Sequence, residues 1–270
     1  MSPAVPPVRP ARPSAGPPGR GRHPGAAEPG AAPAAPSGPL ALLHTSSAHI
    51  PVFDALRDQE HEGLGLRHHV EEGLLARARR DGPAAVADDV RTVLRRAVDA
   101  GARAVLCTCS TLGAVAERTG AAVPVLRVDR PMAAAAVAAG PRVVVLATVA
   151  STLGPTVALI EEEARLAGRA VEVRTRLVAD AWDLFAAGDT GGCARLVADA
   201  ADAVTEADAI VLAQASMTPA QDLVGTAVPV LSSPRLGLAA AAAAVRRQTP
   251  SEHSRARSGG SAPPPSAVGR

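Results

Sequence analysis

The residues best suited to chemistry lie in one short stretch, Cys107-Thr108-Cys109-Ser110-Thr111, which holds two of the three cysteines of the 270-residue chain. The stretch follows an apolar run at 104–106, which is typical of a buried strand with functional groups at its carboxyl end. Cys109 directly precedes a predicted helix, and the N–H groups at a helix start stabilise a thiolate. The pattern therefore indicates thiol chemistry at Cys109.

The other cysteines have simpler interpretations. Cys107 stands one strand step before the turn, so we expect it to point into the sheet as a small apolar residue. Cys193 lies near the start of another predicted helix and is expected to be structural. No second Cys or Cys/His pair stands at ligand spacing, so no metal site is predicted. For Cys109 itself, the alternative is an inert buried thiol.

These residues must be positioned by the elements around them, which alternate between strands and helices. Such alternation implies crossover connections and parallel sheets, with ligands at the carboxyl ends of the strands. The strands are predicted at 40–43, 64–70, 104–107, 123–128, 142–147, 171–177, 210–212 and 229–231, and the helices at 52–56, 84–100, 112–118, 132–139, 156–167, 192–205 and 237–246.

The chain also repeats itself. A shift of 105 positions places 102–126 on 207–231 without a gap and sets Gln214 on Cys109, and a shift of 103 places 42–45 on 145–148. A duplicated αβ unit is predicted. The two halves are 39–140 and 141–247, and the last strand and helix are candidates to pack on the first lobe.

Composition separates this core from two tails. Residues 1–38 and 248–270 are rich in Pro, Ala, Gly and Arg without apolar periodicity, so they are predicted to be disordered. The first tail carries a net charge of +3 and the second +2, whereas the whole chain has a formal net charge of +2, so the core between the tails is acidic, with a net charge of −3. We therefore expect no nucleic-acid partner, since the tail arginines are scattered and lack interleaved aromatic residues.

Other absences exclude whole classes of function. The chain has no lysine, so all 28 basic residues are arginine, and neither a pyridoxal phosphate anchor nor a phosphate loop can form. We expect no cofactor. The apolar run 132–160 is interrupted at Gly140-Pro141 and Gly154-Pro155, and no secretory signal is visible, so no membrane partner is expected and a cytoplasmic location is predicted.

The duplication and the Cys109-Ser110-Thr111 turn together resemble the aspartate/glutamate/hydantoin racemase superfamily, over most of 39–247. In that family each half supplies a cysteine, and the two thiols face each other across the α-carbon of the substrate. The first motif matches well, whereas Gln214-Ala215-Ser216 stands where the second cysteine should be. The resemblance implies an α/β fold of two pseudo-symmetric lobes, each a mainly parallel sheet flanked by helices, with an active-site cleft between them.

The resemblance also implies a function. It suggests an isomerase that acts without a cofactor at the α-carbon of a small carboxylate or amino acid, with the Cys109 thiolate as base or nucleophile, in a chain that could form a homodimer. The alternatives are a single-cysteine decarboxylase of the arylmalonate decarboxylase kind and a non-catalytic small-molecule binding protein on the same scaffold. Candidates for a second acid/base or an orienting group are Gln214, His44 and His49. Candidate substrate-binding residues, each of which could instead be an ordinary helix cap, are Thr45, Ser46, Ser110, Thr111, Thr148 and Thr152.

Overall fold

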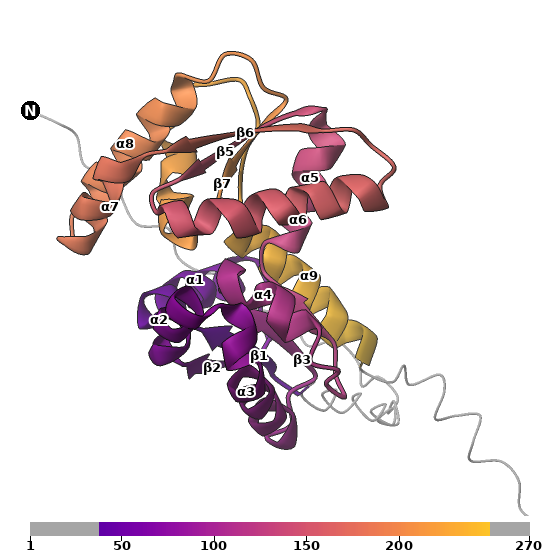
Figure 1. Ribbon diagram of the computed structural model, residues 1–270. Helices are drawn as coiled ribbons and strands as arrows, with labels where there is room; N and C mark the ends of the chain where they lie inside the picture. Colours follow the sequence, from indigo (N-terminus) through magenta and orange to yellow (C-terminus); the bar gives the residue numbers. More distant parts are fainter. Residues whose placement is uncertain (1–37, 249–270) are drawn as a thin grey trace, which may run out of the picture. The chain divides into compact units, whose positions relative to one another are not determined.

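The computed structural model describes residues 38–248, and strands alternate with helices along this range (Figure 1). Except for Gly38 and Gln248, the tails predicted at 1–38 and 248–270 lie outside the described residues. The strands are β1 (Leu40–His44), β2 (Leu66–Val70), β3 (Ala104–Cys107), β4 (Val125–Arg127), β5 (Arg142–Ala147), β6 (Glu172–Leu177), β7 (Ala209–Leu212) and β8 (Val230–Ser232).

The helices cover both faces of the sheets that these strands form. The α-helices are α1 (Ile50–Glu60), α2 (Glu72–Asp81), α3 (Ala87–Asp99), α4 (Ser110–Glu117), α5 (Arg130–Ala139), α6 (Leu153–Leu166), α7 (Ala179–Ala186), α8 (Thr190–Asp202) and α9 (Ser233–Gln248). Short 3-10 helices are η1 (Ser47–His49), η2 (Pro83–Val86), η3 (Ala150–Thr152) and η4 (Ala215–Asp222). None of the helices between residues 38 and 248 is long and apolar enough to cross a membrane.

The strands form two four-stranded sheets with the orders β2-β1-β3-β4 and β6-β5-β7-β8, and all neighbouring strands are parallel. The predicted α/β fold of two mainly parallel sheets flanked by helices is therefore confirmed. Val105 pairs with Val125 in the first sheet, and Ile210 pairs with Val230 in the second. The two pairs differ by the same 105 positions as the sequence repeat, so the halves share strand register as well as strand order.

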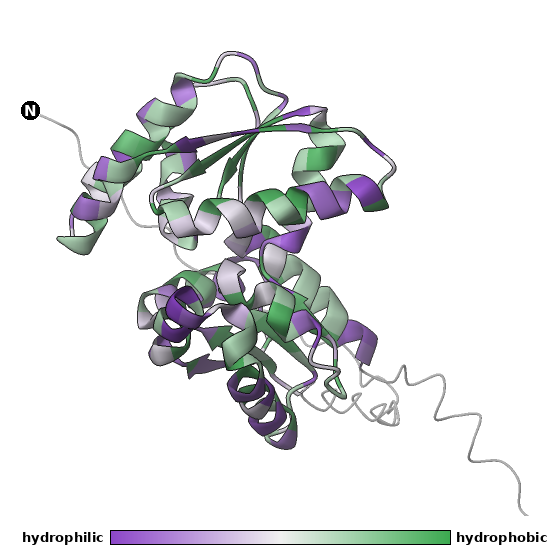
Figure 2. Cartoon of the chain, in the orientation of Figure 1, coloured by the Kyte–Doolittle hydropathy of each residue, from purple (hydrophilic) through white to green (hydrophobic). Residues whose placement is uncertain are grey.

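Each sheet buries both faces, because alternate residues of its central strands point to opposite sides. On the first sheet, Leu43 and Cys107 pack under α2, α3 and α4, whereas Leu42 and Leu106 pack under α1 and α9. The second sheet packs one face on α5 and α6 and the other on α7, α8 and η4. The central strands are therefore mostly hydrophobic, apart from His44 at the end of β1 and Arg142 at the start of β5, while the edge strand β6 is largely exposed and hydrophilic (Figure 2).

The last helix belongs to the opposite sheet from the strand before it. Strand β8 pairs with β7 in the second sheet, but α9 covers the first sheet, where Leu238 and Ala241 lie in one cluster with Leu40 and Leu106. Helices α2 and α7 were not predicted. Each carries few buried residues, Leu74 and Ala78 in α2 and Ala181 alone in α7, so neither leaves a clear apolar stripe in the sequence.

Candidate active site

A cavity of about 140 Å³ lies where the carboxyl ends of β1, β3 and β7 meet. Parallel sheets place their ligands at this end of the strands. Helices α2 and α7 complete the wall. Of the ten residues predicted for the site, those that line the cavity are Thr45, Ser46, His49, Cys109, Ser110, Thr111, Thr152 and Gln214.

Cys109 occupies the N-cap position of α4 with an extended backbone (φ −105°, ψ 115°). Only 8% of the residue is exposed, and it lines the cavity. The N–H groups of Ser110 and Thr111 follow in the first turn, where no intrahelical acceptor exists, and no other protein partner is found for them within 38–248. The thiol and two open N–H donors therefore share one wall, and the helix start favours negative charge there.

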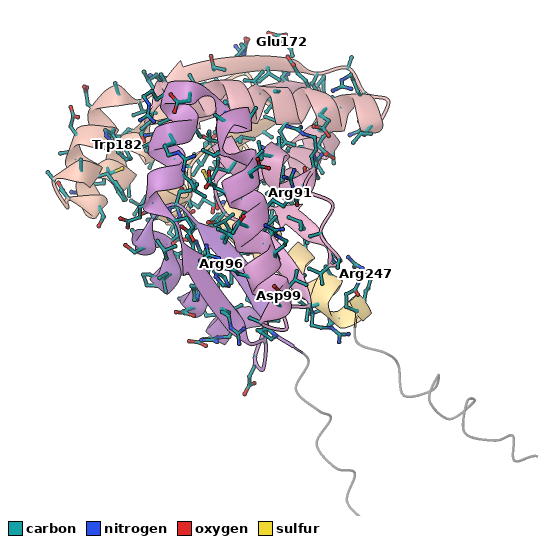
Figure 3. All side chains as sticks on the ribbon, turned by 60° about the horizontal axis from the view of Figure 1, so that its bottom comes forward. Arg91, Arg96, Asp99, Glu172, Trp182 and Arg247 are labelled. Atoms are coloured by element: carbon teal, nitrogen blue, oxygen red, sulfur yellow. The ribbon has the colours of Figure 1, made fainter. Side chains whose placement is uncertain are left out.

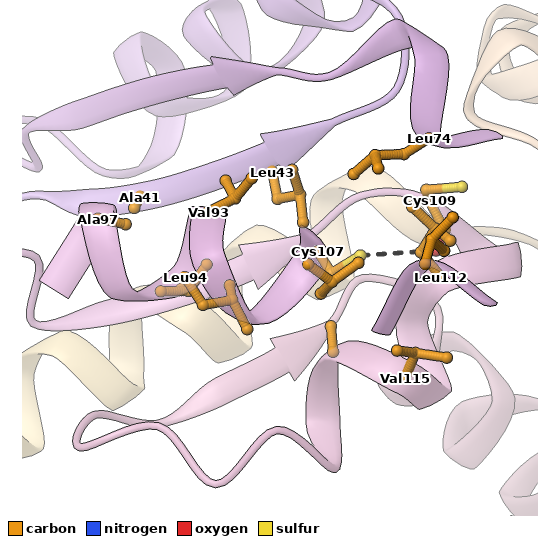
Figure 4. Packing of buried hydrophobic residues seen from close by; sticks show 14 of the residues in the cluster. Ala41, Leu43, Leu74, Val93, Leu94, Ala97, Cys107, Cys109, Leu112 and Val115 are labelled. Atoms are coloured by element: carbon orange, nitrogen blue, oxygen red, sulfur yellow. Dashed lines mark hydrogen bonds between the residues drawn. The ribbon is translucent and has the colours of Figure 1, made fainter. Parts of the chain in front are cut away.

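The other two cysteines do not reach the cavity. Cys107 is fully buried, its Sγ lies 3.7 Å from the Cys109 backbone oxygen, and burial raises the pKa of its thiol. The Cys107 and Cys109 side chains leave the strand end in different directions (Figure 4). Cys193 is 1% exposed within α8, and burial also raises its pKa. Cys109 is thus the one cysteine of the three with access to a ligand.

Gln214 holds the matching position in the second half, at the N-cap of η4 (φ −130°, ψ 141°). Its Oε1 accepts hydrogen bonds from the Thr148 backbone N–H at 2.7 Å, the Thr148 hydroxyl at 3.1 Å and the Val149 N–H at 3.2 Å. Thr148 is predicted to bind substrate, but in the structure it donates hydrogen bonds to Gln214 and does not line the cavity. The N–H groups of Thr148 and Val149 and the Thr148 hydroxyl are therefore occupied by Gln214 and are not free to bind an anion.

The two predicted histidines differ in position. His49 lines the cavity, and its Nδ1 is buried without a hydrogen-bond partner. Burial lowers the pKa of His49, so its neutral form is favoured. His44 is fully buried behind the wall, where burial, followed by the neighbouring histidines, lowers its pKa to about 3. His49 can meet a ligand directly, and His44 cannot.

The hydroxyl groups divide between binding and capping. Ser46 caps η1, because its Oγ accepts from the Ala48 N–H at 3.3 Å. Thr45 is 8% exposed and lines the cavity, and no hydrogen bond within 38–248 uses its hydroxyl. Thr45 therefore has a free donor for a ligand, next to the Ser110 and Thr111 N–H groups in the same half of the molecule.

Eight of the lining residues are not among those predicted for the site, and four of these eight lie on the two unpredicted helices. Leu75 and Arg79 come from α2, and Trp182 and Phe185 come from α7. The Trp182 ring, 37% exposed (Figure 3), stacks on Phe185 with centroids 5.6 Å apart and planes inclined by 29°. Arg79 makes no ion pair with any residue in the described range. One signal was available, since the chain has only one Trp and two Phe, and two of these three stand three positions apart.

No group of three or more His, Cys, Asp or Glu side chains within 38–248 is arranged to hold a metal ion.

The family model described as Asp/Glu/Hydantoin racemase matches residues 52–241. No curated protein matches the sequence.

Solved structures with the same fold include two racemase-type proteins. A glutamate racemase isoform from Bacillus anthracis is 14% identical with a TM-score of 0.58, covering 79% of this chain and 84% of that one. An aspartate racemase homologue from Pyrococcus horikoshii is 12% identical with a TM-score of 0.61, covering 77% of this chain and 99% of that one. A Gly-to-Cys variant of arylmalonate decarboxylase, in its sulfate-associated form, is 20% identical with a TM-score of 0.54, covering 77% and 93%.

Proposed function

Because the chain belongs to the Asp/Glu/hydantoin racemase family, we propose that it transfers a proton at the α-carbon of a small carboxylate without a cofactor, using the Cys109 thiolate as base. The observation that carries the proposal is the Cys109 thiol at the start of α4, inside a cavity that also presents open N–H and hydroxyl donors. The absence of lysine from the chain rules out a Schiff base with pyridoxal phosphate.

The donors beside Cys109 suit the charge that this reaction develops. An α-proton next to a carboxylate is a very weak acid, so the enediolate-like charge must be stabilised as the proton leaves. The Ser110 and Thr111 N–H groups and the Thr45 hydroxyl support the proposal, because fixed donors in residues that line the cavity can stabilise this charge without reorganisation during the reaction. Arg79 supplies a positive charge without a competing carboxylate partner in the described chain.

The second half of the molecule offers no thiol that could act as a second base. Gln214 replaces a thiol with an amide, which cannot take a proton from carbon at neutral pH. Its Oε1 also occupies the N–H groups of Thr148 and Val149. Among the side chains that line the cavity, His49 alone joins Cys109 as a group able both to accept and to donate a proton near neutral pH. We therefore assign the second acid/base role, where the reaction needs one, to His49.

Decarboxylation is the second candidate. Loss of CO₂ leaves a carbanion that needs one proton from one face, and a single thiol can supply it. The wall formed by Leu75, Trp182 and Phe185 favours this reading, because a carboxylate held against apolar rings loses hydration and departs more readily as neutral CO₂. The similarity to arylmalonate decarboxylase is one of fold.

The deciding experiment follows both reactions in deuterated water. The full chain is incubated with single enantiomers of small carboxylates and amino acids and with 2-substituted malonates. Loss of the α-proton signal is followed by NMR, configuration by chiral chromatography and CO₂ release directly. We expect deuterium incorporation with retained configuration, or stereospecific decarboxylation, and loss of either in Cys109→Ala.

The matched control is Cys193→Ala, which removes a thiol outside the cavity and should retain activity. Exchange that persists in Cys109→Ala would overturn the assignment of the base. Full racemisation at about 1 to 1,000 per second would show that His49 completes a two-base site, and His49→Gln should then restrict exchange to one face. Ligand binding without exchange or CO₂ release would favour a non-catalytic binding protein.

A further inference from the structure

A chain of hydrogen bonds leads from the cavity wall to solvent. Thr108 is one of the residues that line the cavity. Its Oγ1 lies 2.8 Å from His44 Nδ1, and His44 Nε2 lies 2.8 Å from His68 Nδ1. His68 Nε2 then lies 3.3 Å from Asp54 Oδ1. Thr108 is 5% exposed and His44 is fully buried, whereas the side chains of His68 and Asp54 are 15% and 40% exposed, so these hydrogen bonds end at solvent.

The fold brings these four groups together from distant parts of the sequence. Thr108 directly follows β3, His44 ends β1 and His68 lies within β2, and these three strands are neighbours in the first sheet. Asp54 comes from α1, which covers the same face of the sheet. The rings of His44 and His68 are nearly coplanar, with planes 17° apart and centroids 5.1 Å apart, which suits a hydrogen bond between their edges. The proposed reaction as described above does not involve these four hydrogen-bonded side chains.

Two arrangements of protons satisfy the chain, and they differ by one proton. In the first, the Thr108 hydroxyl donates to His44 Nδ1, His44 Nε2–H donates to His68 Nδ1, and His68 Nε2–H donates to the Asp54 carboxylate. In the second, the Thr108 hydroxyl donates to the Leu43 carbonyl oxygen, which lies 3.1 Å away. His44 then donates from Nδ1, and His68 donates from both nitrogens as an imidazolium paired with Asp54.

We infer that Thr108, His44, His68 and Asp54 form a proton relay that connects the cavity with solvent and exchanges the proton abstracted from substrate. This role rests on the proposed function. The Cys109 thiol gives up the proton taken from substrate and becomes a thiolate again, and Thr108 Oγ1 receives a proton from the cavity. Thr108 then releases the proton that it already holds to His44 Nδ1, and the Nε2 proton of His44 moves to His68 Nδ1. His68 then loses its Nε2 proton through Asp54 to water. One proton enters at the cavity, one leaves at the surface, and rotation of the hydroxyl and tautomer exchange restore the first arrangement.

The charge of the second arrangement belongs on His68 for a structural reason. His44 is fully buried, and its pKa lies near 3, first because of burial and then because of the neighbouring His68, His49 and His69. His44 therefore conducts a proton by changing tautomer and stays neutral. His68 faces the Asp54 carboxylate, which compensates an imidazolium charge.

Other charged and titratable groups lie close to the four groups of the relay. Arg57 competes for the same Asp54 oxygen at 3.5 Å. His69 follows His68 in β2, on the other face, and has a pKa lowered first by burial and then by the nearby arginines. The neighbouring residues that must stay unsubstituted in a test of the relay are His49, Arg57, Arg67, His69, Glu71 and Arg96.

Nitrogen-15 NMR of the histidine rings in the full chain tests the relay without any substrate. His44 should be neutral and should exchange between two tautomers, with its proton on Nε2 in the first arrangement and on Nδ1 in the second, and its Nε2 should show a scalar coupling to His68 Nδ1 across the hydrogen bond. Asp54→Asn should change the ratio of the two His44 tautomers, and Asp58→Asn, one turn along α1 and 67% exposed, should not. An imidazolium at His44, or a single His44 tautomer that Asp54→Asn leaves unchanged, would overturn the relay.

A kinetic arm then connects the relay to turnover. With the substrate that wild type exchanges best, Asp54→Asn and His68→Gln should lower the rate of deuterium incorporation with little change in KM. The loss should approach the roughly 10²- to 10⁴-fold range of general acid–base effects, and added imidazole should restore part of it in Asp54→Asn. An unchanged rate and pH profile would refute the catalytic role. If wild type exchanges no substrate, the proposed function fails, and the NMR measurement of the His44 tautomers still decides whether the relay exists.

Discussion

Gln214 Oε1 accepts hydrogen bonds from both the backbone N–H and the hydroxyl of Thr148, at 2.7 and 3.1 Å. In the first half the corresponding position is held by Cys109, and neither side chain caps its own helix. Gln214 instead closes the neighbouring turn after β5, whereas no hydrogen bond within 38–248 joins the Cys109 side chain to the matching turn at Thr45 and Ser46.

Removal of the Gln214 amide should therefore weaken the fold. Gln214→Ala leaves the donors of Thr148, which is 4% exposed, without their acceptor, and a buried unsatisfied donor costs about 1–3 kcal/mol. Urea unfolding should report a loss of that size. Ser216→Ala removes another cavity hydroxyl that no hydrogen bond within 38–248 uses, so it should be near neutral. Equal stability of the two variants would show that the Gln214 hydrogen bonds to the turn after β5 do not stabilise the fold.

The cysteines should react in a fixed order. Cys109 reaches the cavity, whereas Cys107 and Cys193 are 0% and 1% exposed with pKa values raised by burial. Since the thiolate is the reactive form, iodoacetamide should modify Cys109 first. Peptide mapping over time measures the order, and early labelling of Cys193 would show that the site is misplaced.

Arg79 should contribute to the binding of an anionic ligand. Charge-assisted hydrogen bonds are worth about 1.5–3 kcal/mol, so Arg79→Gln should weaken the binding of a carboxylate about tenfold or more. The neighbouring Arg80 pairs with Asp81 at 2.8 Å and does not line the cavity, which makes Arg80→Gln the matched control. Calorimetric titration of both variants with one carboxylate gives the comparison, and equal affinities would exclude Arg79 from the binding site.

Stability should fall as the solution becomes acidic, because His44 and His49 have pKa values below the ordinary 6.5 in the folded chain. Unfolding lets both rings bind protons, so the unfolded state gains stability as the pH falls from about 6.5 toward 3. The free energy of unfolding should therefore decrease over this window. In His44→Gln the decrease should be shallower, and an unchanged slope would show that His44 is not held neutral by the fold.

The buried pair of Arg127 and Asp129 should support the turn that carries Cys109. Their side chains are 4% and 1% exposed and meet at 2.6 Å, and Arg127 Nη2 also donates to the Ser110 carbonyl oxygen at 3.4 Å. Asp129→Ala leaves an unpaired buried charge, which costs about 3–5 kcal/mol. The double substitution Arg127→Met with Asp129→Leu should recover much of that loss in urea unfolding, while α4 loses its anchor and exchange at the cavity stays low.

The sequence allowed the strands, seven of the α-helices and the duplication to be predicted, because β3 and β7 carry compact apolar runs with a repeated spacing. It did not reveal α7, whose stacked Trp182 and Phe185 lie on a short and mostly exposed helix. The contact between Gln214 and Thr148 joins residues 66 positions apart and depends on side-chain rotamers. The link between His44 and His68 depends on strand pairing, which periodicity alone does not specify.

The return of α9 to the first sheet has a consequence for synthesis of the chain. Leu40 and Leu42 come early, yet part of their cover comes from Leu238 and Ala241, almost two hundred positions later. While the ribosome is still translating the second half, that face of the first sheet lacks its cover and is open to aggregation or to chaperones. Folding of the first half should therefore finish only after the last helix has left the ribosome. Either half expressed alone should expose apolar surface, on the first sheet or on α9, and should tend to aggregate.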